Sequence, residues 1–328
     1  MRIAQLFGAA CAACLMLFQA AQADPLVVTD AGFLAVANNA LWLVQTTPNG
    51  PAERAQLPQG QTPKFLAAGG VRYLAYSPLG FGWAASSDGI HWNGVAATGD
   101  SPVHTVQIRA NPQALAFADG RFFTALFDGS LCSTSDGNQW TCADKIPQVG
   151  EALSMMTCGQ NLAIMFHTQQ QTPGGNINGE TVGFSPDGKT WTYAATPFYV
   201  FKHACVNGSI VALKTTFGST AVQFITYRPD GQVIESNTLQ QSVFAIGGGA
   251  GKILAIGTTP TYPPRSVVDV STNEGRTFHP AVSPSSQGIQ TLACDTHQCI
   301  AQAQGSGLSF TSTVLLASRD GVHWQPMK

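Results

Sequence analysis

Residues that could bind or transform a ligand are few in this sequence, and they gather in three polar segments. Charged residues make up only 10 % of the 328 residues, so a charged side chain outside a turn is a candidate. The segments are 93–113, 167–180 and 258–266, and we expect them to be long loops. Imidazole, carboxylate, guanidinium and aromatic groups on loops are typical of glycan, peptide or protein recognition. The candidate ligand-binding residues are His104, Arg109, His167, Glu180, Tyr262 and Arg265.

Some of these residue types could also act as catalysts. A glycosidase needs two carboxyl groups about 5–10 Å apart, and Glu180 with Asp100 or Glu151 could meet on one face. Solvent-exposed loop acids explain these carboxylates equally well. The histidines form no H-x-H or H-x-x-x-H pattern, and there is no G-x-S-x-G string. His91 and His323 precede tryptophans and are expected on surface strands. The sequence therefore predicts no catalytic residue, no metal site and no cofactor.

One short string recurs along the chain and places these segments between repeats. Four copies share Asp-Gly and a tryptophan three residues after the glycine: 86–92, 134–140, 185–191 and 318–324. A longer relative occupies 271–278, and degenerate copies occupy 47–50 and 228–231. The repeat glycines are Gly50, Gly89, Gly137, Gly188, Gly231, Gly275 and Gly321, which lie 39 to 51 residues apart. This spacing is close to that of a four-stranded propeller blade.

The string predicts a hairpin turn that is stabilised by its own polar side chains. Asp-Gly supplies the positive φ angles of a tight hairpin, and the Asp and Ser side chains can bond backbone N–H groups inside it. Before each turn lies an apolar strand, a small-residue turn and a second apolar strand, and the first copy is 33–39. Each unit is then four strands, a to d, with the string between c and d. Seven units predict an all-β, seven-bladed β-propeller, with six blades as the alternative.

The first residues read as an export signal. Arg2 precedes the apolar stretch 6–18, and Ala21-Gln22-Ala23 is a small-residue cleavage site. Lipidation at Cys14 is the alternative. We expect residues 1–23 to be a signal peptide, 24–328 to be one propeller domain, and the protein to be exported to the periplasm or outside the cell. No later run is long and apolar enough to span a membrane.

Six cysteines remain after the signal is removed, and an even number in an oxidising compartment predicts disulfides. Six cysteines allow fifteen connectivities. Two pairs each flank a tight turn, and the remaining two cysteines end strand a of neighbouring units. The repeat register favours Cys132–Cys142, Cys158–Cys205 and Cys294–Cys299.

The strings resemble the Asp-box (BNR) repeats of sialidase-like propellers and of related photosystem-assembly and plant-receptor-like modules. The family pattern is S-x-D-x-G-x-T-W/F. Residues 271–278 match it at full length, with Asn273 in place of Asp, and the four tryptophan copies are one residue shorter. The resemblance implies that the repeat turns are structural, and that ligands bind on the face formed by the b–c and d–a connections.

The resemblance does not extend to the sialidase active site. The Arg-Ile-Pro motif is absent, and only Arg54, Arg109 and Arg265 lie outside turns to serve as an arginine triad. The sequence predicts an exported, non-catalytic binding or scaffold module for a glycan, a peptide or an envelope protein. The alternatives are a sialidase-like or other carbohydrate-active enzyme and an assembly factor for an envelope complex. The net charge of −2 argues against nucleic acid, and we expect a monomer.

Overall fold

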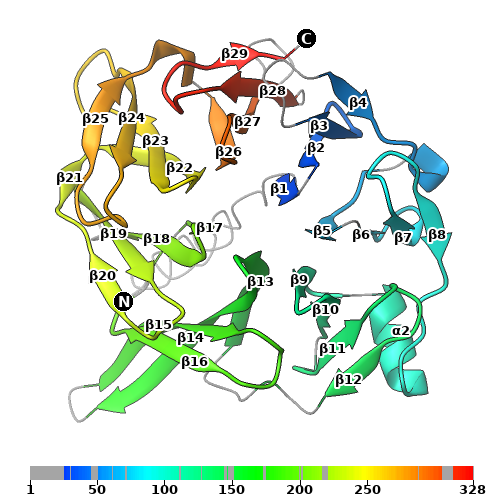
Figure 1. Ribbon diagram of the computed structural model, residues 1–328. Coiled ribbons are helices and arrows are strands. Elements are labelled where there is room, and N and C mark those ends of the chain that lie inside the picture. The colour runs from blue at the N-terminus through cyan, green and yellow to red at the C-terminus, as the bar shows by residue number, and fades with distance from the viewer. Residues whose placement is uncertain are drawn as a thin grey trace, which may run out of the picture.

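Seven antiparallel sheets form a ring in the computed structural model (Figure 1). The prediction of a seven-bladed β-propeller is confirmed, and the six-blade alternative is wrong. The structure describes residues 26–29, 31–45, 51–60, 62–70, 72–110, 112–126, 128–143, 146, 151–172, 175–198, 200, 202–215, 221–286, 288–304 and 313–327. The segment 1–23, expected to be a signal peptide, and the segment 47–50, expected to be a degenerate repeat turn, lie outside these ranges.

Each blade is built from consecutive strands. Blade 1 holds β1 (Leu26–Thr29), β2 (Gly32–Ala37), β3 (Ala40–Gln45) and β4 (Ala52–Arg54). Blade 2 holds β5 (Phe65–Gly69), β6 (Arg72–Ser77), β7 (Gly82–Ser86) and β8 (Asn93–Val95). Blade 3 holds β9 (Ala116–Ala118), β10 (Arg121–Ala125), β11 (Leu131–Thr134) and β12 (Thr141–Ala143). Blade 4 holds β13 (Glu151–Cys158), β14 (Asn161–Thr172), β15 (Gly175–Ser185) and β16 (Thr192–Thr196).

The remaining blades follow the same order. Blade 5 holds β17 (His203–Val206), β18 (Ser209–Thr215), β19 (Ala221–Tyr227), β20 (Val233–Glu235) and the short β21 (Leu239–Gln240). Blade 6 holds β22 (Ser242–Gly249), β23 (Lys252–Thr258), β24 (Ser266–Ser271) and β25 (His279–Val282). Blade 7 holds β26 (Ile289–Cys294), β27 (Cys299–Gln304), β28 (Thr313–Ser318) and β29 (Gln325–Pro326). In the described ranges, one α-helix, α2 (Pro102–Ala110), and 3-10 turns at Pro58–Gly60 and Pro284–Ser286 lie between blades.

The strand order gives the ring two unlike faces. The a–b and c–d turns lie on one face, which we call the repeat-turn face. The b–c turns and d–a connections, including α2, lie on the other, which we call the connection face. Among the described helices, none has the length and hydropathy needed to cross a bilayer.

The repeat turns have the predicted hydrogen bonds between their polar side chains and the backbone N–H groups inside the turn. In blade 3, the N–H of Gly137 donates to Thr134 Oγ1 (3.0 Å), and that of Asn138 donates to Asp136 Oδ1 (2.8 Å). Trp140 Nε1 donates to the carbonyl of Gly137 (2.9 Å). The indole therefore closes over the turn with its one donor satisfied, as a buried tryptophan requires.

His91 and His323 are not strand residues, contrary to the sequence-based expectation. Each belongs to its repeat turn and places Nδ1 at 2.7 and 2.6 Å from Oδ2 of Asp88 and Asp320. The hydrogen bonds from the side chain and backbone of His91 hold the pKa of Asp88 well below its usual range. Such an arrangement favours the ionised carboxylate.

The repeat turns also join each blade to the blade before it. Gly137 has φ +83°, and a Cβ there would lie 2.7 Å from Leu74 of blade 2. The chain leaving blade 2 also pairs with this turn, because Thr98 donates to the Asn138 carbonyl and accepts from the Trp140 N–H, both at 2.8 Å. The same parallel contact joins Gln56 to His91 one blade earlier. The repeat is thus an inter-blade joint as well as a turn.

Blade 1 differs from the predicted register. Residues 33–39 were expected to be strand a and its turn, but they are β2 and the b–c turn. The inner strand is β1, which contacts the inner strands β5 and β26 of both neighbouring blades. The expectation was wrong because β2 is apolar and buried along its whole length, which is the pattern expected of an inner strand.

Among the strands that the structure describes, none is shared between the first and last blades where the ring closes. Blade 1 comes wholly from the start of the domain and blade 7 wholly from its end. Phe33, Val44 and Ile300 pack together across the junction. Gln302 Nε2 donates to the Val36 carbonyl (2.7 Å), and Gln298 Nε2 donates to the Gln45 carbonyl (2.9 Å). Hydrogen bonds from side-chain amides of blade 7 therefore link it to blade 1, as a shared strand would otherwise do.

The structure has the three disulfides that the repeat register favours. Cys132–Cys142 crosses β11 and β12, and Cys294–Cys299 crosses β26 and β27. Cys158–Cys205 joins the inner strands of blades 4 and 5 on the repeat-turn face. The first two stabilise single hairpins, whereas the third links two blades.

Candidate functional site

The six candidate binding residues lie at three places around the ring rather than in one site. His104 and Arg109 are on α2, beside blades 2 and 3; His167 and Glu180 are in blade 4; Tyr262 and Arg265 are in the b–c turn of blade 6. All three places belong to the connection face or its rim.

The segment 93–113 is not a continuous loop, because it contains α2. The hydroxyl of Ser101 accepts the N–H of His104 (3.1 Å), which is the bond of a helix N-cap, and Pro102 takes the first helical position. Arg109 Nε donates to the Ala97 carbonyl (2.6 Å). Trp83 Nε1 donates to the carbonyl of Ile108 (2.9 Å), so the helix end is fixed on blade 2. Arg109 thus helps to anchor the helix.

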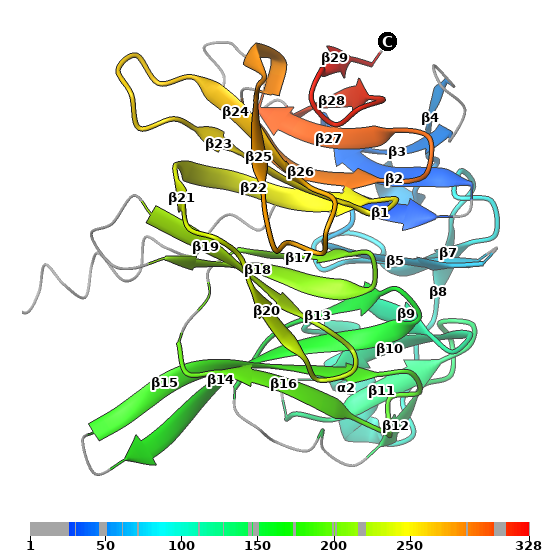
Figure 2. The ribbon, with the colours of Figure 1, turned by 60° about the vertical axis from the view of Figure 1, so that its left-hand side comes forward.

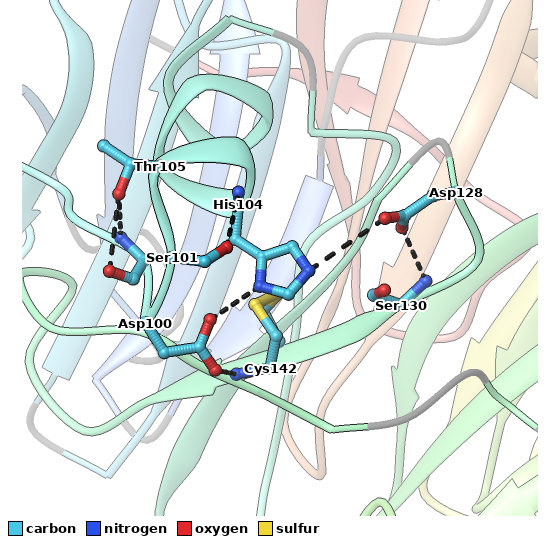
Figure 3. Close-up of polar contacts among 9 residues, drawn as sticks. Asp100, Ser101, His104, Thr105, Asp128, Ser130 and Cys142 are labelled. Carbon is cyan, nitrogen blue, oxygen red and sulfur yellow. Dashed lines mark hydrogen bonds and ion pairs between the residues drawn. A yellow bond between two sulfur atoms is a disulfide. The ribbon is translucent and has the colours of Figure 1, made fainter.

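His104 stands between two carboxylates (Figure 3). Its Nδ1 is 2.6 Å from Oδ1 of Asp100, and its Nε2 is 4.0 Å from Oδ2 of Asp128 in the b–c turn of blade 3. Asp100 Oδ2 also accepts the N–H of Cys142 (2.8 Å). The hydrogen bonds from His104 and Cys142 lower the pKa of Asp100, and the N–H of Ser130 lowers that of Asp128. The ionised Asp100 orients the imidazole through Nδ1–H.

This cluster does not meet the requirements of a metal centre. Asp100, His104 and Cys142 bring their ligand atoms within 4.8 Å of one another, but the sulfur of Cys142 is committed to its disulfide. Both oxygens of Asp100 already accept hydrogen bonds. His104 Nε2 and Asp128 Oδ2 remain, and two ligands fall short of the three or four protein ligands of zinc sites. The cluster suits a hydrogen-bond donor placed between the imidazole and Asp128.

The segment 167–180 is a β-hairpin, not a loop. β14 and β15 pair from Leu162–Ser185 out to Thr172–Gly175, and they project beyond the ring (Figure 2). His167 and Glu180 are cross-strand partners, and His167 Nδ1 lies 2.7 Å from Oε1 of Glu180. The sequence named both residues but not their pairing, because the strand register was hidden in a stretch rich in Gly and polar residues.

Glu180 is fully buried, whereas solvent-exposed loop acids were expected. Burial raises the pKa of Glu180 to about 8, against a smaller lowering by the N–H of Val200. Burial therefore favours the protonated carboxyl at neutral pH, and the carboxyl faces Nδ1 of the half-exposed His167. A buried acid of this kind can donate a proton, but a substrate can reach only the imidazole in front of it.

A serine–histidine pair nearby was missed by the sequence analysis. Ser154 Oγ lies 2.9 Å from Nε2 of His203, and burial lowers the pKa of His203 to about 4. Nε2 of the neutral imidazole can accept a hydrogen bond from the serine hydroxyl, the contact that a nucleophile–base pair also makes. The pair nevertheless bridges β13 and β17, the strands that Cys158–Cys205 joins further along. The hydrogen bond is therefore a second link between blades 4 and 5, beside the disulfide.

The b–c turn of blade 6 presents a ring to solvent. Tyr262 is 99 % exposed. The loop is closed by the N–H of Thr259, which donates to the Arg265 carbonyl (2.9 Å), and by that of Arg265, which donates to Thr259 Oγ1 (3.0 Å). The peptide bond between Tyr262 and Pro263 is cis. The aromatic ring is thus held on a short closed loop.

A cavity of about 600 Å³ opens at the other end of the ring axis. It is lined by the repeat-turn ends of the inner strands of blades 1 to 4, with Phe117 as its aromatic wall. Thr29, Asp119, Thr157 and Gln160 supply its polar groups. Its volume is within the range of small-molecule sites. It lies opposite the face on which ligands were expected.

Comparisons with known proteins support the fold of this chain and nothing beyond it. No family model matches the chain, and no curated protein matches it. Among solved structures, YCF48 bound to a D1 peptide is 16 % identical, with 83 % of each chain covered and a TM-score of 0.53. YCF48 from Cyanidioschyzon merolae is 12 % identical (84 % and 90 % covered, TM-score 0.51). Virginiamycin B lyase from Staphylococcus aureus is 11 % identical (85 % and 90 % covered, TM-score 0.52).

Proposed function

We propose that this protein is a non-catalytic scaffold that captures a peptide segment of another exported protein on its connection face. One observation carries the proposal. Seven large apolar side chains are exposed in the described part of the chain, and six of them lie on the connection face or its rim. These six are Leu79, Val103, Val106, Phe244, Tyr262 and Val282.

Exposed apolar side chains favour contact with protein segments, and all but one of those in the described part of the chain belong to the same face or its rim. Aromatic anchors contribute most of the affinity in such sites, and Tyr262 and Phe244 provide two. Arg265 beside Tyr262 adds a cation that suits a peptide carboxylate or carbonyl. The solved structure of YCF48 with a D1 peptide supports the idea that a propeller of this shape can serve as a peptide scaffold.

Membership of the Asp-box propellers and export are parts of the same proposal. The hydrogen bonds of the repeat turns support the first, and three disulfides support an oxidising compartment. We propose that residues 1–23 are removed and that the partner is met in the periplasm or outside the cell. The experiment must distinguish binding of a peptide from binding of a glycan.

The test selects ligands first and then maps them. Random displayed peptides are selected on the purified protein, and the affinity of the best one is measured by calorimetry for the wild type, Tyr262→Ala and Leu79→Ala. We expect a loss of about tenfold or more for at least one variant, as for an interface anchor. Val28→Ala is the control, because Val28 lines the cavity on the opposite face.

Two results would overturn the proposal. In the first, the selected peptides lose affinity through Val28→Ala and not through the connection-face variants. In the second, no peptide is selected while a glycan array gives specific binding. The second result would favour carbohydrate recognition.

A further inference from the structure

The cavity on the repeat-turn face is formed by the inner strands of four neighbouring blades. Its walls are the ends of β1, β5, β9 and β13, the a–b turns that follow the last three of these strands, and one repeat turn of blade 4. In blades 3 and 4 the a–b turn is a two-residue hairpin loop. Loops of this length allow their residues few conformations, so these walls are rigid.

Phe117 forms the aromatic wall, and contacts from three blades hold it in place. A Cβ at Gly69 of blade 2 would lie 1.9 Å from the Phe117 ring, so the ring takes the space that a side chain at position 69 would need. Within blade 3, the ring makes an edge contact with buried Phe122, and the ring centroids are 5.0 Å apart. The N–H of Phe117 donates to Thr157 Oγ1 of blade 4 (2.7 Å). The ring is therefore fixed where it lines the cavity.

Asp119 is the one charged residue among those that line the cavity. It begins the a–b turn of blade 3, where it has φ +46°. In the part of the chain that the structure describes, its carboxylate makes no hydrogen bond or ion pair. Arg72 and Arg121, which are close to two of the turns in sequence, are not lining residues, and Arg72 Nη1 donates to the Ser135 carbonyl (2.7 Å). The negative charge of Asp119 is therefore available to a ligand.

An aromatic wall together with a free carboxylate is suited to an organic cation. A carboxylate accepts charge-assisted hydrogen bonds from an ammonium group, and the face of an aromatic ring attracts a cation within about 6 Å. Thr29 and Gln160 offer a hydroxyl and an amide for a polar substituent. The lining residues include no Lys, Arg or His that would attract an anion.

We propose that this cavity binds a small organic cation, with the ammonium group of the ligand at Asp119 and its apolar body against Phe117. The volume of about 600 Å³ suits such a ligand, because small-molecule sites measure about 300–1,000 Å³. The inference goes beyond the proposed function. It assigns a ligand of a different kind to the opposite face, and peptide capture uses neither Asp119 nor Phe117.

The experiment compares three probes that share an indole ring and differ in charge: tryptamine, tryptophol and indole-3-propionate. Each is titrated into the whole protein with labelled methyl groups, and binding is followed by NMR at Val28, Ala68 and Ala118, which line the cavity. Tryptamine should shift these signals with a dissociation constant of about 1 mM, the affinity typical of a ligand of this size. Tryptophol should bind at least about threefold more weakly, and indole-3-propionate should give no saturable shift.

Matched variants separate the charge from the apolar wall. Asp119→Asn removes the charge and keeps the turn, because asparagine also adopts positive φ. It should weaken tryptamine binding at least about threefold and leave tryptophol binding unchanged. Asp230→Asn makes the same change in the repeat turn of blade 5, outside the cavity, and should change neither affinity. Phe117→Leu should weaken both probes, because it removes the ring and leaves the charge. Far-ultraviolet circular dichroism checks that each variant keeps the propeller intact.

Three results would overturn the proposal. They are the absence of saturable tryptamine shifts up to about 10 mM, indole-3-propionate binding as tightly as tryptamine, and equal tryptamine affinity in the wild type and Asp119→Asn. None of these results bears on peptide capture, because Tyr262 and Leu79 lie in b–c turns on the connection face.

Discussion

At the scale of single residues, the buried acid Glu180 is the most informative group. Its carboxyl lies where β14 and β15 extend beyond the rest of blade 4, against His167 and close to Tyr227, whose pKa burial raises to about 12. Thr196 opposite Glu180 bonds the Tyr227 hydroxyl at 2.9 Å. A protonated Glu180 fits this interface between blades 4 and 5, whereas an ionised one would lack water around it.

Glu180→Gln tests this state through the pH dependence of stability. Folding raises the pKa from 4.5 to about 8. The stabilisation is therefore complete below about pH 4.5 and is lost as pH rises through about 8. Between these limits the wild type should lose about 3–5 kcal/mol of unfolding free energy that Glu180→Gln keeps. Urea unfolding at pH 5 and pH 8.5 measures it.

The control is Glu53→Gln in β4, which makes the same carboxyl-to-amide change in blade 1. Equal pH dependence in wild type and Glu180→Gln would show that the acid is ionised at neutral pH. The sequence named Glu180 and His167 as candidates, but it could not show them as partners. Pairing across strands depends on register, and polar, glycine-rich strands specify register weakly.

At the scale of elements, the repeat turn does two things at once. Its hydrogen bonds close the hairpin, and its glycine, which has no Cβ, leaves room for a side chain of the preceding blade. The hydrogen bonds were predictable from Asp-Gly chemistry. The contact between blades was not, because Leu74 lies 63 positions before Gly137 in the chain. The helix α2 was missed although Ser101-Pro102 is a helix-start signal.

Two glycines of blade 3 separate these contributions. Gly137 and Gly120 both have positive φ, +83° and +69°, but only a Cβ at Gly137 meets another atom, at 2.7 Å from Leu74. Gly120→Ala should cost about 1–2 kcal/mol for the backbone conformation alone. Gly137→Ala should cost about 1–3 kcal/mol more because of overpacking.

The two variants are compared by thermal and urea unfolding. Equal losses would mean that the repeat turns do not hold the blades together and act only within their own hairpins.

At the scale of the whole molecule, the sequence predicted the blade number because the repeat period is local. It did not predict how the ring closes, since the side-chain amides of Gln298 and Gln302 reach carbonyls more than 250 positions earlier. It also could not place the 600 Å³ cavity, whose walls come from four blades. The two faces therefore offer two distinct surfaces, one with a cavity and one with exposed apolar side chains.

Hydrogen–deuterium exchange with a selected peptide, on the whole protein, distinguishes these surfaces most directly. If peptide capture on the connection face is correct, saturating peptide should slow exchange in the b–c turns 78–81 and 259–265 or in α2, and leave the turns at 119–120 and 159–160 unchanged. Protection confined to these two turns, whose Asp119, Gly159 and Gln160 line the cavity, would contradict it.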